Sequence, residues 1–178
     1  MAKRAKKRGS PGRRVTNAEC ARLQMVIFDF DGVMSDNRVL VMQDGTEGVF
    51  CNRSDGLGIG MMHKAGVPMM VISKEENPVV SARCRKLNLT CMQGVDDKLS
   101  ALKVVLAEKG FDAARTAYVG NDINDLPCME YVGLPIAVAD AYAPVLAVAR
   151  WTTTRAGGHG AVREVCDRVL DAKEGARA

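Results

Sequence analysis

The segment Val26–Asp36 places the strongest constraint on the fold, because a run of apolar residues leads directly into two aspartates and a glycine. Such a run is typical of a buried parallel strand, and in open α/β sheets chemistry is found just beyond the carboxyl ends of strands. A turn at Gly32 can bring Asp29 and Asp31 into one small volume, where two carboxylates repel each other unless a cation or a shared proton lies between them. Mg²⁺, which prefers oxygen ligands, is the expected cation. The alternative is a strand followed by an ordinary acidic turn, since Asp and Gly are common turn residues.

Composition predicts one domain of the α/β class. The chain has 178 residues, of which 47% are hydrophobic but only 4% aromatic, as expected of a single aliphatic α/β domain. No apolar run is long enough to cross a membrane, and the six cysteines are widely spaced without a Cys-x-x-Cys pair. We therefore expect a cytoplasmic protein with reduced thiols, without disulfides or a zinc site, and without a membrane or nucleic-acid partner.

The N-terminal stretch is strongly basic. Residues 2–14 contain seven Lys or Arg and no acidic residue. We interpret residues 1–22 as a solvated, disordered tail, with binding to an anionic surface as the alternative. Residues 23–172 are then expected to form the domain, and residues 173–178 a short C-terminal tail.

Strand and helix patterns alternate along the chain, which predicts a parallel sheet covered by helices on both faces. Strands are expected at Met25–Phe30, Pro68–Ser73, Leu89–Met92, Thr116–Gly120 and Leu134–Val138, and helices at Gly56–Ala65, Pro78–Leu87, Asp97–Lys109, Asn124–Tyr131, Ala143–Arg150 and Gly160–Ala172. One β-hairpin interrupts this order at Arg38–Cys51, around the turn residues Asp44 and Gly45. Because the hairpin directly follows the acidic turn, we expect it to overhang the site as a flap.

Three further features fall at expected strand ends. Ser73 ends one strand with a hydroxyl, the run Gly120–Asp125 ends another with oxygen-rich side chains, and Lys98 opens the helix after a third. The strand that ends at Asp29 should lie between those ending at Ser73 and Gly120, because both must converge on it. Taken singly, each feature also suits a helix cap or a surface lysine.

The ordered set of motifs resembles the haloacid dehalogenase superfamily of phosphatases, whose first motif is DxDGxx[TS]. Within it the chain resembles the 3-deoxy-octulosonate 8-phosphate phosphatase group, through the segments Asn52–Ile59, Val138–Ala141 and Gly157–Glu164. The segment Ile72–Val80 is more similar to the phosphatase-like domain fused to bacterial N-acylneuraminate cytidylyltransferases. The resemblance implies a Rossmann-like parallel sheet with helices on both faces, a β-hairpin flap and no separate cap domain.

The resemblance also implies a role for each motif residue. Asp29 would be the nucleophile that forms an aspartyl-phosphate, and Asp31 would protonate the leaving oxygen and then deprotonate water. Ser73 and Lys98 would bind the phosphoryl group, with Lys98 also neutralising Asp29. Mg²⁺ would bind the Asp29 carboxylate, the backbone carbonyl of Asp31 and a residue of the Gly120–Asp125 loop.

One position departs from the family pattern. Members usually have Asp directly after the glycine of the fourth motif, whereas this chain has Asn121 followed by Asp122. Either residue can supply the metal ligand, and a neutral amide in place of a carboxylate predicts weaker Mg²⁺ binding. Asp125 is expected to orient Lys98 or the loop.

Substrate-binding residues are expected on both sides of the site. Arg53, Asp55 and Gly56 follow the flap and either hold the substrate or fix the base of the flap, while Lys74 and Glu75 are expected to help select the sugar. The leading hypothesis is a Mg²⁺-dependent phosphatase of a sugar-acid phosphate, most plausibly an N-acylneuraminate 9-phosphate, with the eight-carbon acid 8-phosphate as alternative substrate. The resemblance implies a homotetramer. A weakly active or non-catalytic tetramerisation module that partners a nucleotide-sugar synthetase is the alternative of another class.

Overall fold

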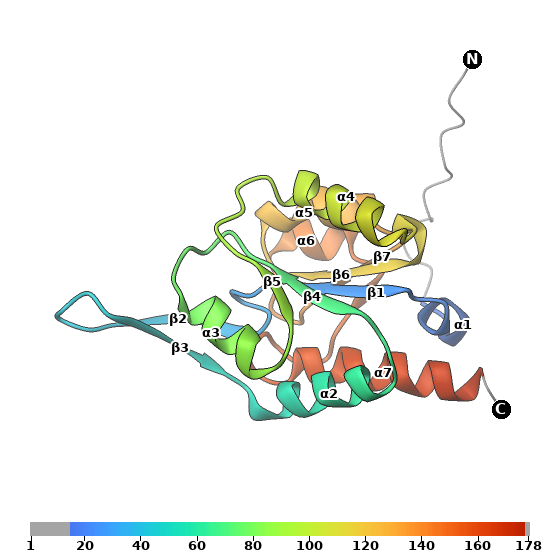
Figure 1. Ribbon diagram of the computed structural model, residues 1–178, viewed down its shortest axis with the longest axis horizontal. Helices are drawn as coiled ribbons and strands as arrows, with labels where there is room; N and C mark the ends of the chain where they lie inside the picture. The colour runs from blue at the N-terminus through green and yellow to red at the C-terminus, as the bar shows by residue number, and fades with distance from the viewer. Residues whose placement is uncertain (1–14, 177–178) are drawn as a thin grey trace, which may run out of the picture.

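A six-stranded parallel sheet forms the centre of the computed structural model, which describes residues 15–176 (Figure 1). Its strand order is β5-β4-β1-β6-β7-β8, and every neighbouring pair is parallel. The strands are β1 Met25–Phe28, β4 Met69–Ile72, β5 Thr90–Met92, β6 Thr116–Gly120, β7 Leu134–Ala137 and β8 Trp151–Thr152. Strand β1 lies between β4 and β6, which confirms the expected placement of Asp29 between Ser73 and Gly120. The two-residue strand β8 was not expected.

Helices cover the sheet on both faces, as predicted. Figure 1 shows α4, α5 and α6 on one face and α2 and α7 on the other. Helix α3 packs on β5, and α1 packs on α7. The helices are α1 Asn17–Ala21, α2 Arg53–Lys64, α3 Val79–Lys86, α4 Lys98–Lys109, α5 Leu126–Tyr131, α6 Ala143–Val148 and α7 Ala161–Gly175, with 3₁₀ turns at Ala113–Arg115 and Ile123–Asp125.

Buried strands and capped helices explain why this sequence adopts the fold. Every residue of β1, β4, β6 and β7 is buried, so these apolar runs have both faces covered. Helix α4 begins where the Asp97 side chain accepts a hydrogen bond from the Ser100 amide, and it ends at Gly110 in the left-handed conformation. Capping therefore fixes the start of α4, and with it the position of Lys98.

The β-hairpin flap is confirmed. Strands β2, Ser35–Val41, and β3, Glu47–Cys51, pair in antiparallel fashion and project away from the sheet (Figure 1). The turn contains Gly45 at φ 85°, and the Asp44 side chain accepts a hydrogen bond from the Thr46 amide. The pairing is irregular between Ser35 and Val39, so the base of β2 contains a bulge.

Both expected tail boundaries need correction. Residues 15–22 belong to the fold, because Thr16 and Glu19 form a capping box that starts α1 and Cys20 is completely buried. At the other end, α7 continues to residue 175, and Lys173 Nζ donates to the backbone oxygens of Ala21 at 3.0 Å and Leu23 at 2.9 Å. The basic residues 2–14 lie outside the described residues.

The cysteines and the helices bear on the expectations about disulfides and membrane spans. All six cysteines are free thiols, four of them buried, and no disulfide forms between them. Within residues 15–176, no helix is both long and apolar enough to cross a membrane.

Candidate active site

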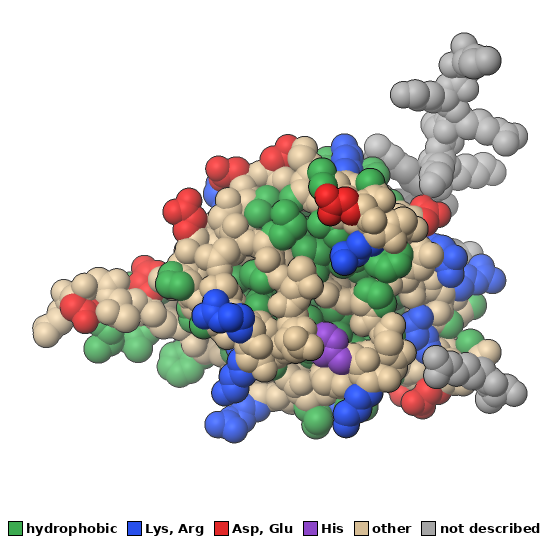
Figure 2. Space-filling view, in the orientation of Figure 1, with side chains coloured by type: hydrophobic (Ala, Val, Ile, Leu, Met, Phe, Trp, Pro, Cys, Tyr) green, Lys and Arg blue, Asp and Glu red, His purple; other side chains and the backbone are tan. Residues whose placement is uncertain are grey.

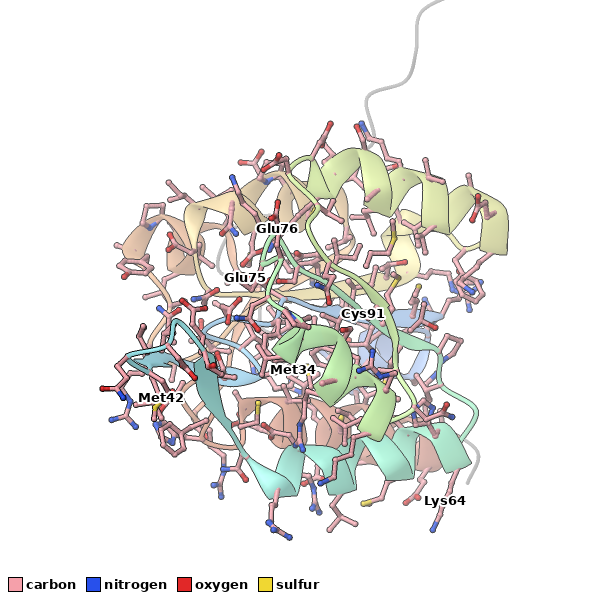
Figure 3. All side chains as sticks on the ribbon, turned by 60° about the vertical axis from the view of Figure 1, so that its left-hand side comes forward. Met34, Met42, Lys64, Glu75, Glu76 and Cys91 are labelled. Carbon is pink, nitrogen blue, oxygen red and sulfur yellow. The ribbon has the colours of Figure 1, made fainter. Side chains whose placement is uncertain are left out.

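The carboxyl ends of β4, β1 and β6 meet at one edge of the sheet and open into a pocket of about 580 Å³. Asp29, Ser73 and Asn121 each follow directly after one of these strands. Figure 3 shows Glu75 and Glu76 together on the loop that follows β4. The pocket is lined by Asp29, Asp31, Asn37, Ser73, Lys74, Glu75, Glu76, Gly94, Asp96, Asn121, Asp122, Ile123 and Asn124.

A buried ion-pair network forms the floor of this pocket. Lys98 Nζ lies 2.7 Å from Asp29 Oδ1 and 2.9 Å from Asp125 Oδ1, and all three side chains are at most 5% exposed. Burial raises the pKa of Asp29, as does the charge of Asp125, whereas Lys98 opposes the rise. For Lys98, burial alone would lower the pKa, but its two carboxylate partners outweigh burial and raise it. Lys98 therefore stays protonated, and its charge offsets part of the rise in the pKa of Asp29.

Asp125 connects this network to the loop that follows β6. Its Oδ2 accepts hydrogen bonds from the backbone amides of Asn121 at 3.0 Å and Asp122 at 3.5 Å. Its Oδ1 also accepts from the hydroxyl of Tyr118 at 2.9 Å. Asp125 thus orients both Lys98 and the loop, as the sequence predicts.

Asp31 lies at the side of the pocket in an environment that favours its protonated form. Burial raises the pKa of Asp31, and the charge of Glu75 adds to this effect. Ser35 Oγ donates to Asp31 Oδ1 at 3.4 Å and accepts from the Gly32 amide at 3.3 Å. Gly32 has φ 75°, and a Cβ atom there would collide with the Asn121 amide, so glycine is required where the two loops touch. A carboxyl with a raised pKa is suited to donate a proton.

Ser73 presents its hydroxyl to the same pocket. It is 1% exposed, and its Oγ accepts a hydrogen bond from the Glu75 amide at 3.1 Å. Because the oxygen already accepts a backbone N–H, the hydroxyl proton can be donated to an anion such as a phosphoryl oxygen.

The donor set fits Mg²⁺. Asn121 is 5% exposed and its Oδ1 is buried without a hydrogen-bond partner among the described residues, in a pocket that also holds the Asp29 and Asp31 carboxylates. Asp122 Oδ1 instead accepts a hydrogen bond from the Ile123 amide at 2.6 Å and caps the following turn. Asn121 therefore fits the ligand position better than Asp122. Within the described chain, no group of three or more His, Cys, Asp or Glu side chains is placed to hold a metal ion.

The structure brings most of the predicted site residues together. Asp29, Asp31, Ser73, Lys74, Glu75, Asn121 and Asp122 line the pocket, and Lys98 lies behind Asp29. Lys74 forms an ion pair with Asp96 at 3.0 Å on the rim.

The expectation that Arg53, Asp55 and Gly56 hold the substrate is not met within one chain, because none of them lines the pocket. Asp55 is 1% exposed. Its Oδ1 accepts a hydrogen bond at 2.9 Å from the backbone amide of Arg163, which lies in the first turn of α7. Asp55 instead joins the N-terminal ends of α2 and α7 just after the flap. Asp55 therefore links two helices and does not line the pocket of its own chain.

Four polar pocket residues were not assigned to the site from the sequence, namely Asn37, Glu76, Asp96 and Asn124. Asp96 stands only two positions before Lys98, a spacing that could have indicated it. Asn37 reaches the pocket through the bulge in β2, for which the sequence gives no clear signal.

Comparisons with known proteins agree with this geometry. Residues 73–165 match the family model of haloacid dehalogenase-like hydrolases. The 3-deoxy-D-manno-octulosonate 8-phosphate phosphatase of Escherichia coli (strain B / BL21-DE3) is 38% identical over 154 residues, which cover 86% of this chain and 82% of the relative.

Solved structures show the same relationship. A HAD family hydrolase from Streptomyces avermitilis is 46% identical with a TM-score of 0.84, covering 90% of this chain and 97% of that one. A 3-deoxy-D-manno-octulosonate 8-phosphate phosphatase from Moraxella catarrhalis, solved with magnesium, phosphate and KDO, is 31% identical with a TM-score of 0.86, covering 89% and 91%. The chain is therefore a phosphatase of the haloacid dehalogenase-like hydrolase family.

Proposed function

We propose that this protein hydrolyses the phosphomonoester of a sugar acid with Mg²⁺ as cofactor, and that the substrate is 3-deoxy-D-manno-octulosonate 8-phosphate. The observation that carries the chemistry is the buried Asp29, held 2.7 Å from Lys98 on the pocket floor beside Ser73 and Asn121. The substrate assignment rests on the relatives, which carry this substrate in their names and match over most of their length.

The residues present support a two-step reaction. The Asp29 carboxylate forms an O–P bond while the bond from phosphorus to the sugar oxygen breaks, and Asp31 transfers its proton to that oxygen. Asp31 then removes a proton from water, which attacks phosphorus, releases inorganic phosphate and restores Asp29. Lys98 and Ser73 offset the negative charge of the phosphoryl oxygens in both steps. When bound, Mg²⁺ would be held by Asp29, the Asp31 carbonyl and Asn121, and would supply further positive charge beside the phosphoryl group.

N-acylneuraminate 9-phosphate is the second candidate substrate. It is favoured by the segment Ile72–Val80, whose Lys74, Glu75 and Glu76 line the pocket. The relatives favour the eight-carbon acid, which is why we place it first. Paired measurements of kcat/KM on the two compounds decide between them.

The nucleophile test uses Asp29→Asn, with Asp171→Asn at an exposed position of α7 as a control of the same chemical change. We expect Asp29→Asn to reduce Mg²⁺-dependent phosphate release at least about 10³-fold, because the amide cannot form the acyl phosphate. The control should retain wild-type turnover, and both variants should unfold cooperatively. Unchanged activity in Asp29→Asn would exclude the mechanism.

We further propose a homotetramer in which each flap helps to cover a neighbouring site. The flap exposes five large apolar side chains, each more than 50% exposed, namely Val39, Leu40, Val41, Met42 and Phe50. Figure 2 shows apolar side chains along the edge of the hairpin, and Figure 3 places Met42 near its tip. Such a surface on a projecting element is typical of a protein interface.

Light scattering on the wild type and on Val41→Asp tests this assembly. The wild type should behave as a tetramer, and the variant should dissociate and lose turnover, because a charge would have to be buried at the interface. A stable wild-type monomer with full turnover would contradict the proposal.

A non-catalytic role beside a nucleotide-sugar synthetase is the alternative from another class, and Asn121 in place of the usual carboxylate favours it. Against it stands the intact ion pair of Asp29 with Lys98, which a purely structural module does not need. A phosphatase assay with added Mg²⁺, run beside a pull-down with such a synthetase, separates the two roles.

A further inference from the structure

Two non-glycine residues within 15–176 have a positive φ, and they occupy different environments. Asn88 (φ 54°) directly follows the C-cap of α3, where Asn and Gly are the usual residues. Asn37 (φ 63°) lies inside strand β2, at the bulge between Ser35 and Val39. The helix end explains Asn88. At Asn37 the backbone alone would be served better by glycine, which adopts this conformation without steric cost.

The bulge directs Asn37 into the active-site pocket, which it lines. Its side chain lies close to Gly32, because a Cβ atom built there would be 3.3 Å from Asn37 Cγ and would also collide with the Asn121 amide. No hydrogen bond to a protein group engages the Asn37 carboxamide among the described residues, so its acceptor oxygen and two N–H donors are available.

A shared hydroxyl places Asn37 next to the acid. The backbone amide of Asn37 donates to Ser35 Oγ at 3.4 Å, and the same hydroxyl donates to Asp31 Oδ1 at 3.4 Å. In the proposed reaction Asp31 protonates the oxygen of the leaving group. The sugar attached to that oxygen must then lie beside Asp31, on the side of the pocket that Asn37 lines.

Besides Asn37, the neutral donors that line the pocket are Ser73 and Asn121, already placed at the phosphoryl group and the metal, and Asn124, which lies on the loop after β6. The charged side chains mostly accept hydrogen bonds. Glu75, Glu76, Asp96 and Asp122 are carboxylates, which when ionised only accept hydrogen bonds, and Lys74 is paired with Asp96. Sugar hydroxyls need partners that donate as well as partners that accept. A neutral carboxamide provides both without adding charge.

We propose that Asn37 is a specificity-determining residue whose carboxamide N–H groups donate hydrogen bonds to hydroxyls of the sugar part of the substrate. The inference rests on the proposed function and deepens it. Asn37 selects the leaving group, whereas Asp29, Lys98 and Ser73 act on the phosphoryl group, which all phosphomonoesters share.

The test compares Asn37→Gly with Asn88→Gly, which makes the same substitution at the same backbone conformation away from the pocket. Each enzyme is assayed with Mg²⁺ on 3-deoxy-D-manno-octulosonate 8-phosphate and on p-nitrophenyl phosphate, whose leaving group has no such hydroxyls. Asn37→Gly should lower the ratio of the two kcat/KM values by about three- to tenfold, the loss expected for one or two neutral hydrogen bonds. Asn88→Gly should leave the ratio at the wild-type value.

A third variant, Asn37→Asp, retains the acceptor but loses the donors, and its ratio should fall at least as far as that of Asn37→Gly. An unchanged ratio in Asn37→Gly overturns the inference while the proposed function stands. A changed Mg²⁺ requirement on both esters with an unchanged ratio also overturns it, because the carboxamide would then act at the metal. If the wild type hydrolyses p-nitrophenyl phosphate without preferring the sugar acid, the proposed substrate is wrong and the inference falls with it.

Discussion

At the scale of single residues, the site depends on Asn121 and Asp122, which are adjacent in sequence but differ in surroundings. Asn121 Oδ1 is buried without a protein partner, whereas the Asp122 carboxylate caps the turn that follows it. An amide oxygen brings no charge to the cation, so metal affinity at this position is lower than a carboxylate would give.

Measuring turnover over a range of Mg²⁺ concentrations tests whether Asn121 or Asp122 is the metal ligand. We expect Asn121→Asp to lower the Mg²⁺ concentration for half-maximal activity by roughly tenfold, which corresponds to about 1.4 kcal/mol. Asp122→Asn should leave that concentration nearly unchanged and change stability little, because asparagine keeps the oxygen that accepts a hydrogen bond from the Ile123 amide. The opposite pattern would show that Asp122 is the ligand, and no change in either variant would remove this loop from the metal site.

At the scale of elements, the contact between α2 and α7 is predicted to depend on pH. Burial raises the pKa of Asp55 from 3.8 to about 6. The folded protein then binds this proton more tightly than the unfolded chain, so the contribution of Asp55 to stability is lost as pH rises from about 4 to about 6. Asp55→Asn keeps an acceptor for the Arg163 amide and removes the buried charge.

We expect Asp55→Asn to be more stable than the wild type at pH 7.5 by about 1–3 kcal/mol, and to match it near pH 4. Urea unfolding at pH 4, 5, 6 and 7.5 measures the difference. A variant that is less stable at pH 7.5 would show that the two helix N-termini stabilise the carboxylate enough to outweigh its burial.

The loop between β8 and α7 supports the loop that carries Asp31. Gly158 has φ 67°, its amide donates to the Val33 oxygen at 3.0 Å, and an added Cβ would collide with the Asp36 backbone nitrogen. Gly66 has φ 70° with open space around it, so it shares the backbone conformation without the contact.

Gly158→Ala should therefore cost about 2–4 kcal/mol and Gly66→Ala only about 1–2 kcal/mol. Gly158→Ala should also lower kcat, because relief of the clash displaces the Ser35–Asp36 backbone beside Asp31. Thermal unfolding and steady-state kinetics on both variants provide the measurement. Equal losses in the two variants would show that only backbone strain matters at Gly158.

At the scale of the whole molecule, the sequence predicts those features that depend on local patterns. Apolar runs ending in Asp29, Ser73 and Gly120 predict the sheet and its strand order, and Asp44 with Gly45 predicts the flap. The sequence does not reveal α1, because a five-residue helix after a basic stretch has little periodicity, although Thr16 and Glu19 carry a capping signal. Asn37 and Asp55 were missed or misassigned because their positions depend on a bulge and on a partner 108 residues away.

The packing of α1 against α7 determines where another protein module could be attached to this domain. Lys173 ties the last helix to Ala21 and Leu23, and α1 lies at the opposite end of the molecule from the flap (Figure 1). A protein module joined to the domain beside α1 would therefore be attached at the end of the molecule opposite the flap.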